Sequence, residues 1–245
     1  MKFYVIGITD HPKPFFPPEV MAIISNGKVF SGGKRHHEIV APLLPEGAEW
    51  IDITVPLDAV FEEFIVHSAK SIVIFASGDP LFLGFANTIR RKLPEAEIIV
   101  YPTFNSLQML AHRLVMPYHD MRIVSLTGRP WSEFDRALIE RAPKIGILTD
   151  KEHTPATIAQ RMIEYGYSDF IMHVGEKLGN PSTERILTLS LNEAIQRDFI
   201  MPNCVIVEPC DTEASRPFGI SDSEFTLLDG REKMITKMPI RLLTL

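Results

Sequence analysis

The chain has 245 residues, 45% of them hydrophobic, and a formal net charge of −6 at pH 7. This length suits one large α/β domain or two small ones, and the hydrophobic content is ample for packed cores. No apolar run approaches the roughly 18 residues of a membrane span, and an acidic chain without a basic tract argues against a nucleic-acid partner.

The apolar run at the N-terminus is too short for a signal peptide, because Asp10 and His11 end it. The chain has two cysteines, Cys204 and Cys210. Two are too few to indicate a disulfide framework or a cysteine-rich zinc site. We therefore expect a cytoplasmic protein and no metal centre.

Up to residue 115, apolar runs of strand length alternate with amphipathic stretches of helical period. Strands are predicted at 2–8, 28–30, 50–55, 72–76 and 97–101. Helices are predicted at 18–24, 34–43, 57–65, 80–92 and 105–115. This strict alternation is typical of a mainly parallel sheet with helices on both faces.

Residues 116–120 are the best candidate for a linker, because the pattern restarts after them. Strands are then predicted at 122–126, 144–149, 170–174, 185–189 and 203–207, with helices at 133–141 and 155–165. The short connection before 185–189 predicts that this strand is antiparallel to the one before it. We therefore expect an α/β fold of two subdomains, 1–117 and 118–209, with mainly parallel sheets and a ligand-binding cleft between them.

The most informative stretch is Ser77-Gly78-Asp79-Pro80, which directly follows a buried apolar run. Asp79 is expected to cap a helix in which Pro80 takes the first position, where its missing N–H costs nothing. Such a strand, glycine turn and helix would place the turn at the carboxyl end of a strand, where open α/β sheets bind ligands. The alternative is that Asp79 only caps the helix.

Residues 77–82, Ser-Gly-Asp-Pro-Leu-Phe, with Gly84 after them, resemble the signature loop of the tetrapyrrole methylases. Four further stretches are similar to this family in order and spacing: Ser31-Gly-Gly-Lys-Arg-His36, Val124-Ser-Leu-Thr-Gly-Arg129, Leu148-Thr-Asp150 with Thr154-Pro155, and Val174-Gly-Glu-Lys-Leu-Gly179. The resemblance covers about residues 2–208. It is strongest to the enzymes that methylate C5 of a late precorrin, with or without cobalt, in cobalamin biosynthesis.

Two positions depart from the family pattern. Thr9 stands where the family usually has a second glycine in its first loop, which is thought to face the tetrapyrrole. Thr103 replaces the glycine of a Pro-Gly-Ile-Ser-Ser segment, so backbone approach is expected to be tighter there.

The resemblance implies an S-adenosylmethionine-dependent C-methyltransferase that forms a homodimer. It implies a methyl-donor site in the cleft made by Gly78, Asp79, Phe82, Asn105, Ser106, Leu148, Gly175 and Asn203. The tetrapyrrole carries many carboxylates, so cations are expected in its pocket, and Lys34, Arg35 and Arg129 are the candidates. No catalytic base is assigned, although His36, His37 and His119 can titrate near neutral pH.

Two alternatives remain open at this point. The chain could be another methylase of the same fold, acting on ribosomal RNA or on a modified histidine of a translation factor, as in diphthine synthesis. It could also be a non-catalytic nucleotide-binding module, although it has no Gly-x-Gly-x-x-Gly or Walker-type loop.

Residues 210–245 follow the last predicted strand. Their start is polar and typical of a linker, whereas 218–225 and 234–245 resemble the opening of a C15-methylating, decarboxylating enzyme. We expect a linker and the start of a second methyltransferase domain here, which makes the chain the front part of a two-enzyme polypeptide. The alternative is an extension that packs on its own domain or on a dimer mate.

Overall fold

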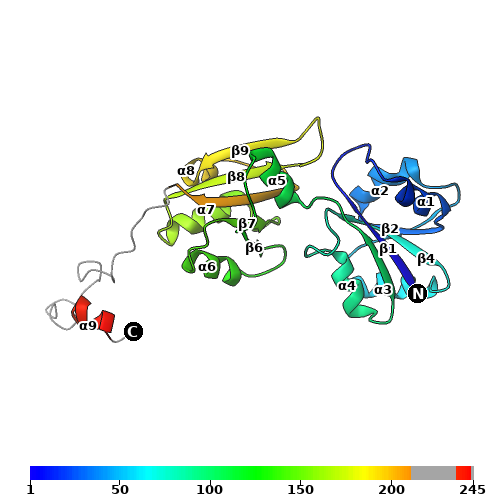
Figure 1. Ribbon diagram of the computed structural model, residues 1–245, viewed down its shortest axis with the longest axis horizontal. Helices are drawn as coiled ribbons and strands as arrows, with labels where there is room; N and C mark the ends of the chain where they lie inside the picture. Colours follow the sequence, from blue (N-terminus) through cyan, green and yellow to red (C-terminus); the bar gives the residue numbers. More distant parts are fainter. Residues whose placement is uncertain (211–235, 244–245) are drawn as a thin grey trace. The chain divides into compact units, whose positions relative to one another are not determined.

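The computed structural model describes residues 1–210 and 236–243, in two compact units, Met1–Pro209 and Cys210–Leu245. The second unit contains one described helix, α9 (Met238–Leu243). Most of the stretch expected to open a second domain, 211–235, lies outside the described residues. The first unit has an α/β fold with two five-stranded sheets. Figure 1 shows how its helices and strands are arranged.

The first sheet is entirely parallel. Its strand order is β3 (Glu49–Asp52), β2 (Val29–Gly32), β4 (Ser71–Ser77), β1 (Lys2–Ile8) and β5 (Glu97–Tyr101). One face is covered by α1 (Pro18–Asn26), α2 (Lys34–Val40) and the short 3₁₀ helix η1 (Ala41–Leu43). The other face is covered by α3 (Leu57–Val66) and α4 (Phe85–Lys92) (Figure 1). The expected parallel architecture of this half is confirmed.

Strand β4 shows why both faces must be covered. Ile72 and Ile74 pack toward α3 and α4, whereas Val73 and Phe75 pack toward α1 and α2. Successive side chains of a strand point to opposite faces. A strand that is apolar at every position is therefore stable only in the middle of a sheet with helices on both sides.

The second sheet is mixed. Its strand order is β6 (Arg122–Ser125), β7 (Ile145–Leu148), β10 (Asn203–Pro209), β8 (Phe170–Glu176) and β9 (Arg185–Ser190). Only β6 and β7 are parallel, and the other three pairs are antiparallel. The expected antiparallel pairing of 185–189 is confirmed, but the expectation of a mainly parallel sheet is wrong for this half. The connection from β8 to β9 is too short for a crossover, and β10 returns between β7 and β8.

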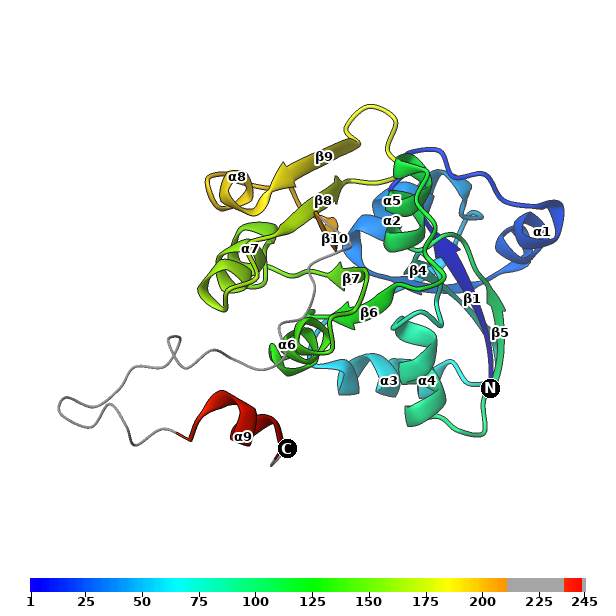
Figure 2. The same cartoon turned by 60° about the vertical axis from the view of Figure 1, so that its left-hand side comes forward.

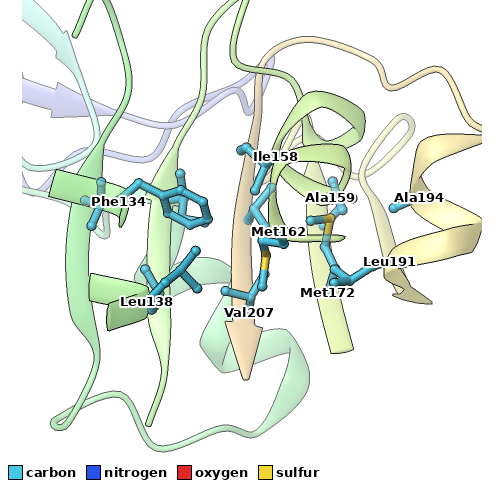
Figure 3. Close-up of a cluster of buried hydrophobic side chains, with 14 of the residues drawn as sticks. Phe134, Leu138, Ile158, Ala159, Met162, Met172, Leu191, Ala194 and Val207 are labelled. Carbon is cyan, nitrogen blue, oxygen red and sulfur yellow. The ribbon is translucent and has the colours of Figure 1, made fainter. Parts of the chain in front are cut away.

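The two faces of the second sheet are covered by helices from different parts of the chain. Figure 3 shows one face, where Phe134 of α6 (Ser132–Ile139), Met162 of α7 (Pro155–Glu164) and Ala194 of α8 (Leu191–Ile195) form the core with strand residues such as Val207. The short helix α8 has no counterpart among the sequence-based predictions.

The opposite face is covered by α5 (Ser106–Leu114), which follows the last strand of the first sheet. Its Leu107 and Leu110 pack against Cys204 and Ile206 of β10. Figure 1 shows α5 beside β8 and β9 of the second sheet, and Figure 2 shows the same elements turned by 60°. The chain therefore passes from one sheet to the other before α5. A subdomain boundary at residue 117 stays a prediction.

The helix after the central turn begins later than predicted. Helix α4 starts at Phe85 with Gly84 as its N-cap residue, and residues 78–84 form turns. The Asp79 carboxylate accepts a hydrogen bond from the Leu81 N–H at 2.8 Å, which is an Asx turn. The prediction that Asp79 caps this helix is therefore wrong, because the aspartate closes a local turn instead.

Candidate functional site

A pocket of about 430 Å³ opens between the two sheets of the first unit. This volume lies within the range of roughly 300–1,000 Å³ that is common for small-molecule sites. The loops after β1, β4 and β5 form one wall. The other wall consists of the start of α5 and the adjoining ends of β7, β8 and β10.

The loops of the first wall are in close backbone contact at two glycines, Gly7 and Gly78. The Gly78 N–H donates a hydrogen bond to the Ile8 carbonyl at 2.8 Å. Gly78 has a φ of +62°, and a Cβ on it would lie 2.9 Å from the Cα of Asn105. A Cβ on Gly7 would lie 2.0 Å from the Gly78 carbonyl oxygen and 2.8 Å from the Thr103 nitrogen. These contacts permit no side chain, so the two glycines fix the backbone that lines the pocket.

A polar cluster stands on this wall. The Ser77 hydroxyl lies 2.8 Å from Nη2 of Arg35 and 2.9 Å from Nε2 of His36. Nη1 of Arg35 also forms an ion pair with Asp10 at 3.3 Å. Burial and the neighbouring Arg35 charge lower the pKa of His36 to about 4. His36 is therefore neutral at physiological pH.

The second wall begins with the N-terminus of α5. The Asn105 side chain accepts a hydrogen bond from the Gln108 N–H at 2.9 Å, while the Gln108 side chain accepts one from the Asn105 N–H at 3.1 Å. This capping box satisfies two backbone groups at the helix start. Asn105 and Ser106 line the pocket, and the positive end of the helix dipole there favours a negatively charged group of a ligand.

The rest of the second wall consists of strand ends. Leu148 ends β7, Gly175 lies near the end of β8, and Asn203 begins β10. A Cβ on Gly175 would lie 2.8 Å from the Leu178 side chain, so glycine keeps this part of the wall flat. The Thr149 hydroxyl lies 2.7 Å from both the carbonyl and the side-chain oxygen of Asn203. These contacts fix Asn203 within the wall.

The structure brings most of the candidate methyl-donor residues together. Seven of the eight line this one pocket: Gly78, Phe82, Asn105, Ser106, Leu148, Gly175 and Asn203. Asp79 does not line it. That these residues hold the methyl donor stays a prediction.

The three candidate cations are separated. Arg35 lines the pocket, whereas Lys34 and Arg129 are exposed and do not line it. Arg129 follows a turn in which the Gly128 N–H donates to the Asp150 carboxylate at 2.8 Å. Burial acts to raise the pKa of Asp150, but hydrogen bonds from the His153, Gly128 and Glu152 backbone N–H groups outweigh it and lower the pKa to about 2. Asp150 is therefore ionised and organises this loop.

The candidate histidines are separated as well. His36 lines the pocket. His37 stacks on Trp50 with 4.1 Å between ring centroids, and His119 is exposed outside the pocket. Sequence reasoning assigned no role to several other pocket residues, among them Thr9, Asp10, Ser77, Met109 and Pro202. Ser77 stood inside the signature stretch, and its position at a strand end was the available signal.

The pocket lies where strand ends of both sheets meet the start of helix α5. In α/β folds, such strand ends are where ligands commonly bind. Residues 2–195 match the sequence pattern of the tetrapyrrole (corrin/porphyrin) methylases, and the chain belongs to this family. Within the described residues, the helices are all too short or too polar to cross a bilayer.

Two relatives carry names that describe a reaction. A Sinorhizobium protein named precorrin-6Y C(5,15)-methyltransferase (decarboxylating) is 28% identical over 243 residues, which are 98% of this chain and 57% of that protein. A Salmonella typhimurium protein named cobalt-precorrin-7 C(5)-methyltransferase is 27% identical over 204 residues, which are 83% of this chain and 98% of that protein. The chain thus spans little more than half of the longer relative.

The fold is shared with a solved structure. A uroporphyrin-III C-methyltransferase from Thermus thermophilus, complexed with S-adenosylhomocysteine, superposes with a TM-score of 0.64 at 17% identity. The superposition covers 85% of this chain and 92% of that one. At this identity the likeness establishes the fold.

Proposed function

We propose that this protein transfers a methyl group from S-adenosylmethionine to C5 of a late precorrin, or of its cobalt form, in cobalamin biosynthesis. The observation that carries the proposal is the convergence of seven candidate methyl-donor residues, from both sheets, on one pocket. The names of the Sinorhizobium and Salmonella relatives support the choice of substrate and ring position. Neither alternative, a different methylase of this fold or a nucleotide-binding module, is favoured.

The pocket fits the methyl donor in size and in chemistry. Gly78 and Gly175 leave flat backbone, the start of α5 suits a carboxylate, and Phe82 and Leu148 offer apolar contacts. We propose that these residues, with Asn105, Ser106 and Asn203, hold S-adenosylmethionine. When bound, its sulfonium supplies an electrophilic methyl group.

The chain's own contribution would be alignment and exclusion of water. The pocket lining is largely apolar, with Ile53, Phe75 and Phe85 among its residues. Holding two reactants in the reactive geometry can lower a barrier by roughly 7–11 kcal/mol. A neutral His36 is consistent with a mechanism that requires little acid or base assistance from side chains.

The direct test is mass spectrometry of products after incubation with S-adenosylmethionine and late precorrins, prepared with and without cobalt. We expect one added methyl group on the tetrapyrrole and formation of S-adenosylhomocysteine. The position of the methyl group, read by nuclear magnetic resonance, should be C5. Methylation of ribosomal RNA or of a protein instead would contradict the proposal.

A binding test addresses the methyl-donor site by itself. Calorimetry should show binding of S-adenosylhomocysteine but not of ATP or NAD. Leu148→Ala should weaken that binding at least about fivefold, or roughly 1 kcal/mol. Leu189→Ala is the matched control, because Leu189 lies in the core of the second sheet away from the pocket. Equal affinities of the two variants would remove Leu148 from the site.

Three finer expectations remain proposals: a homodimer, a cytoplasmic location, and a second methyltransferase domain that begins within residues 210–245. Support for the last is that the match to the longer Sinorhizobium relative covers 98% of the chain. Light scattering would measure the oligomeric state. The mass of the native polypeptide in its source organism would test for the second domain, and a polypeptide that stops at residue 245 would contradict it.

A further inference from the structure

The Ser77 hydroxyl at the end of β4 is held by two neighbouring side chains of α2. Nη2 of Arg35 donates to it at 2.8 Å, and Nε2 of His36 lies at 2.9 Å. All three residues line the pocket. Ser77 itself is exposed toward the pocket, so a ligand can reach its hydroxyl.

The tautomer of His36 follows from its other nitrogen. Nδ1 accepts a hydrogen bond from the Gly33 N–H at 3.3 Å. A neutral imidazole carries one proton, so that proton is on Nε2, which therefore donates to Ser77. A hydrogen bond with the Phe75 backbone acts to raise the pKa of His36, but burial and the Arg35 charge outweigh it.

These two hydrogen bonds determine where the hydroxyl proton points. A serine hydroxyl has two acceptor lone pairs and one proton to donate. Arg35 and His36 occupy both lone pairs, and within residues 1–210 and 236–243 the hydroxyl proton has no acceptor. The proton is therefore directed away from both side chains, where water or a ligand in the pocket can accept it.

The charges around Ser77 indicate the chemistry of that acceptor. Arg35 is paired with Asp10, whose side chain is only 12% exposed, while the Arg35 side chain is 39% exposed. Asp10 thus balances part of the Arg35 charge and leaves guanidinium N–H groups accessible. A hydroxyl and a guanidinium side by side offer only hydrogen-bond donors, and a carboxylate is the group that they bind best.

We propose that Ser77 and Arg35 bind one carboxylate of the tetrapyrrole substrate, and that His36 is a positioning residue that orients the Ser77 hydroxyl. The inference rests on the proposed function. Asp10 follows β1, Arg35 and His36 lie in α2, and Ser77 ends β4. Gly78 and Phe82 follow Ser77, but the other five methyl-donor candidates that line the pocket come from the start of α5 and from the second sheet. For this reason we assign the cluster to the tetrapyrrole rather than to the carboxylate of S-adenosylmethionine.

The test compares Ser77→Ala with Ser77→Thr, which keeps the hydroxyl, and with Glu38→Ala, which removes an exposed charged side chain of α2 outside the pocket. Ser77→Ala should raise the KM for the tetrapyrrole about tenfold, while the Kd for S-adenosylhomocysteine stays within about twofold. Ser77→Thr and Glu38→Ala should both stay near wild type. His36→Phe should raise the same KM without changing the Kd for S-adenosylhomocysteine.

Two results would overturn the proposal: an unchanged KM in Ser77→Ala, or an equal loss of S-adenosylhomocysteine affinity, which would assign the cluster to the methyl donor. Thermal unfolding of each variant shows whether it is folded.

A second readout separates this proposal from the proposed function. Uroporphyrin, a polycarboxylated porphyrin, serves as an equilibrium probe through quenching of its fluorescence and requires no catalysis. If the wild type transfers no methyl group but binds the probe, and Ser77→Ala alone binds it about tenfold more weakly, the carboxylate site stands and the reaction assignment fails. Equal binding by all variants, or no binding by the wild type, overturns the carboxylate site.

Discussion

The two walls of the pocket come from sheets of different construction. In the parallel first sheet, the carboxyl ends of all strands reach the same edge, so the loops after β1, β4 and β5 converge there. In the mixed second sheet, the pocket edge combines the carboxyl ends of β7 and β8 with the amino end of β10. A search for residues after strands therefore finds the first wall, but it does not explain why Asn203 lies on the second.

The walls also differ in chemistry. The first carries the charged and hydroxyl groups of Asp10, Arg35 and Ser77, which are linked through side-chain contacts. The second wall presents the start of α5, Gly175 and Asn203. The side-chain oxygens of Asn105 and Asn203 already accept hydrogen bonds from the protein. Under the two proposals above, the charged and hydroxyl groups of the first wall recognise the substrate, whereas residues of both walls hold the methyl donor.

The largest expected effect tests whether the two cores are equally important. Phe134 of α6, which packs on the second sheet, and Phe64 of α3, which packs on the first, are both fully buried. Phe134→Ala and Phe64→Ala should each lower the free energy of unfolding by about 3–5 kcal/mol. Denaturant titration measures the loss, and Trp50 and Trp131 report on the first and second halves by fluorescence. A loss below about 1 kcal/mol in either variant would show that its core is loosely packed.

The next effect tests the close backbone contacts of Gly7 in the first wall. Gly7→Ala places a Cβ 2.0 Å from the Gly78 carbonyl oxygen, so the backbone must move. We expect a loss of about 3 kcal/mol, the upper end for overpacking. Gly33→Ala is the control, because its Cβ would meet nothing closer than 3.8 Å. If chemical denaturation gives the two variants the same stability, the backbone around Gly7 is not tightly packed.

His36 and Asp150 should affect the stability of the protein in different pH ranges, which a pH titration of stability can distinguish. The pKa of His36 is lowered from 6.5 to about 4, so the unfolded state binds more protons between these values. The stability from neutral His36 is complete above pH 6.5 and is lost as the pH falls toward 4. The pKa of Asp150 is lowered from 3.8 to about 2, so its contribution is lost only below pH 3.8.

We therefore expect the wild type to lose about 3 kcal/mol more than His36→Gln between pH 7 and pH 4. Urea titrations at several pH values measure this difference. Parallel curves for the two proteins would contradict a lowered pKa for His36.

The smallest effect concerns the attachment of α5 to the second sheet. Arg113 of α5 donates to Glu184 at 2.5 Å, and Glu184 also accepts the Gly179 N–H at 2.6 Å. Arg113→Gln should cost about 1 kcal/mol, and less at high salt. Arg136→Gln breaks an exposed pair with Glu140 at the end of α6, and it should lower the stability less than Arg113→Gln does. A reversed order in thermal unfolding would show that the α5 pair is not the stronger one.

Local chemistry made several features predictable. Thr154 caps α7 with Pro155 in the first position, as its sequence indicates. Five strands of the first sheet were found from apolar runs, and most of the candidate methyl-donor residues from motifs beside them. The start of α4 was missed because Asp79 and Pro80 favour both a helix start and an Asx turn. The neighbouring residues in the sequence do not distinguish a helix start from the Asx turn that the structure contains.

The sequence by itself determined most of the segments that form helices and strands, because periodicity and caps depend on neighbours a few residues away. It also determined the family, since the motifs occur in a fixed order. Only the tertiary structure decided that β10 returns antiparallel between β7 and β8, that α5 crosses to the second sheet, and that His36 and Arg35 orient Ser77. Those features depend on contacts between residues far apart in the chain, and their geometry exists only after the two sheets have packed.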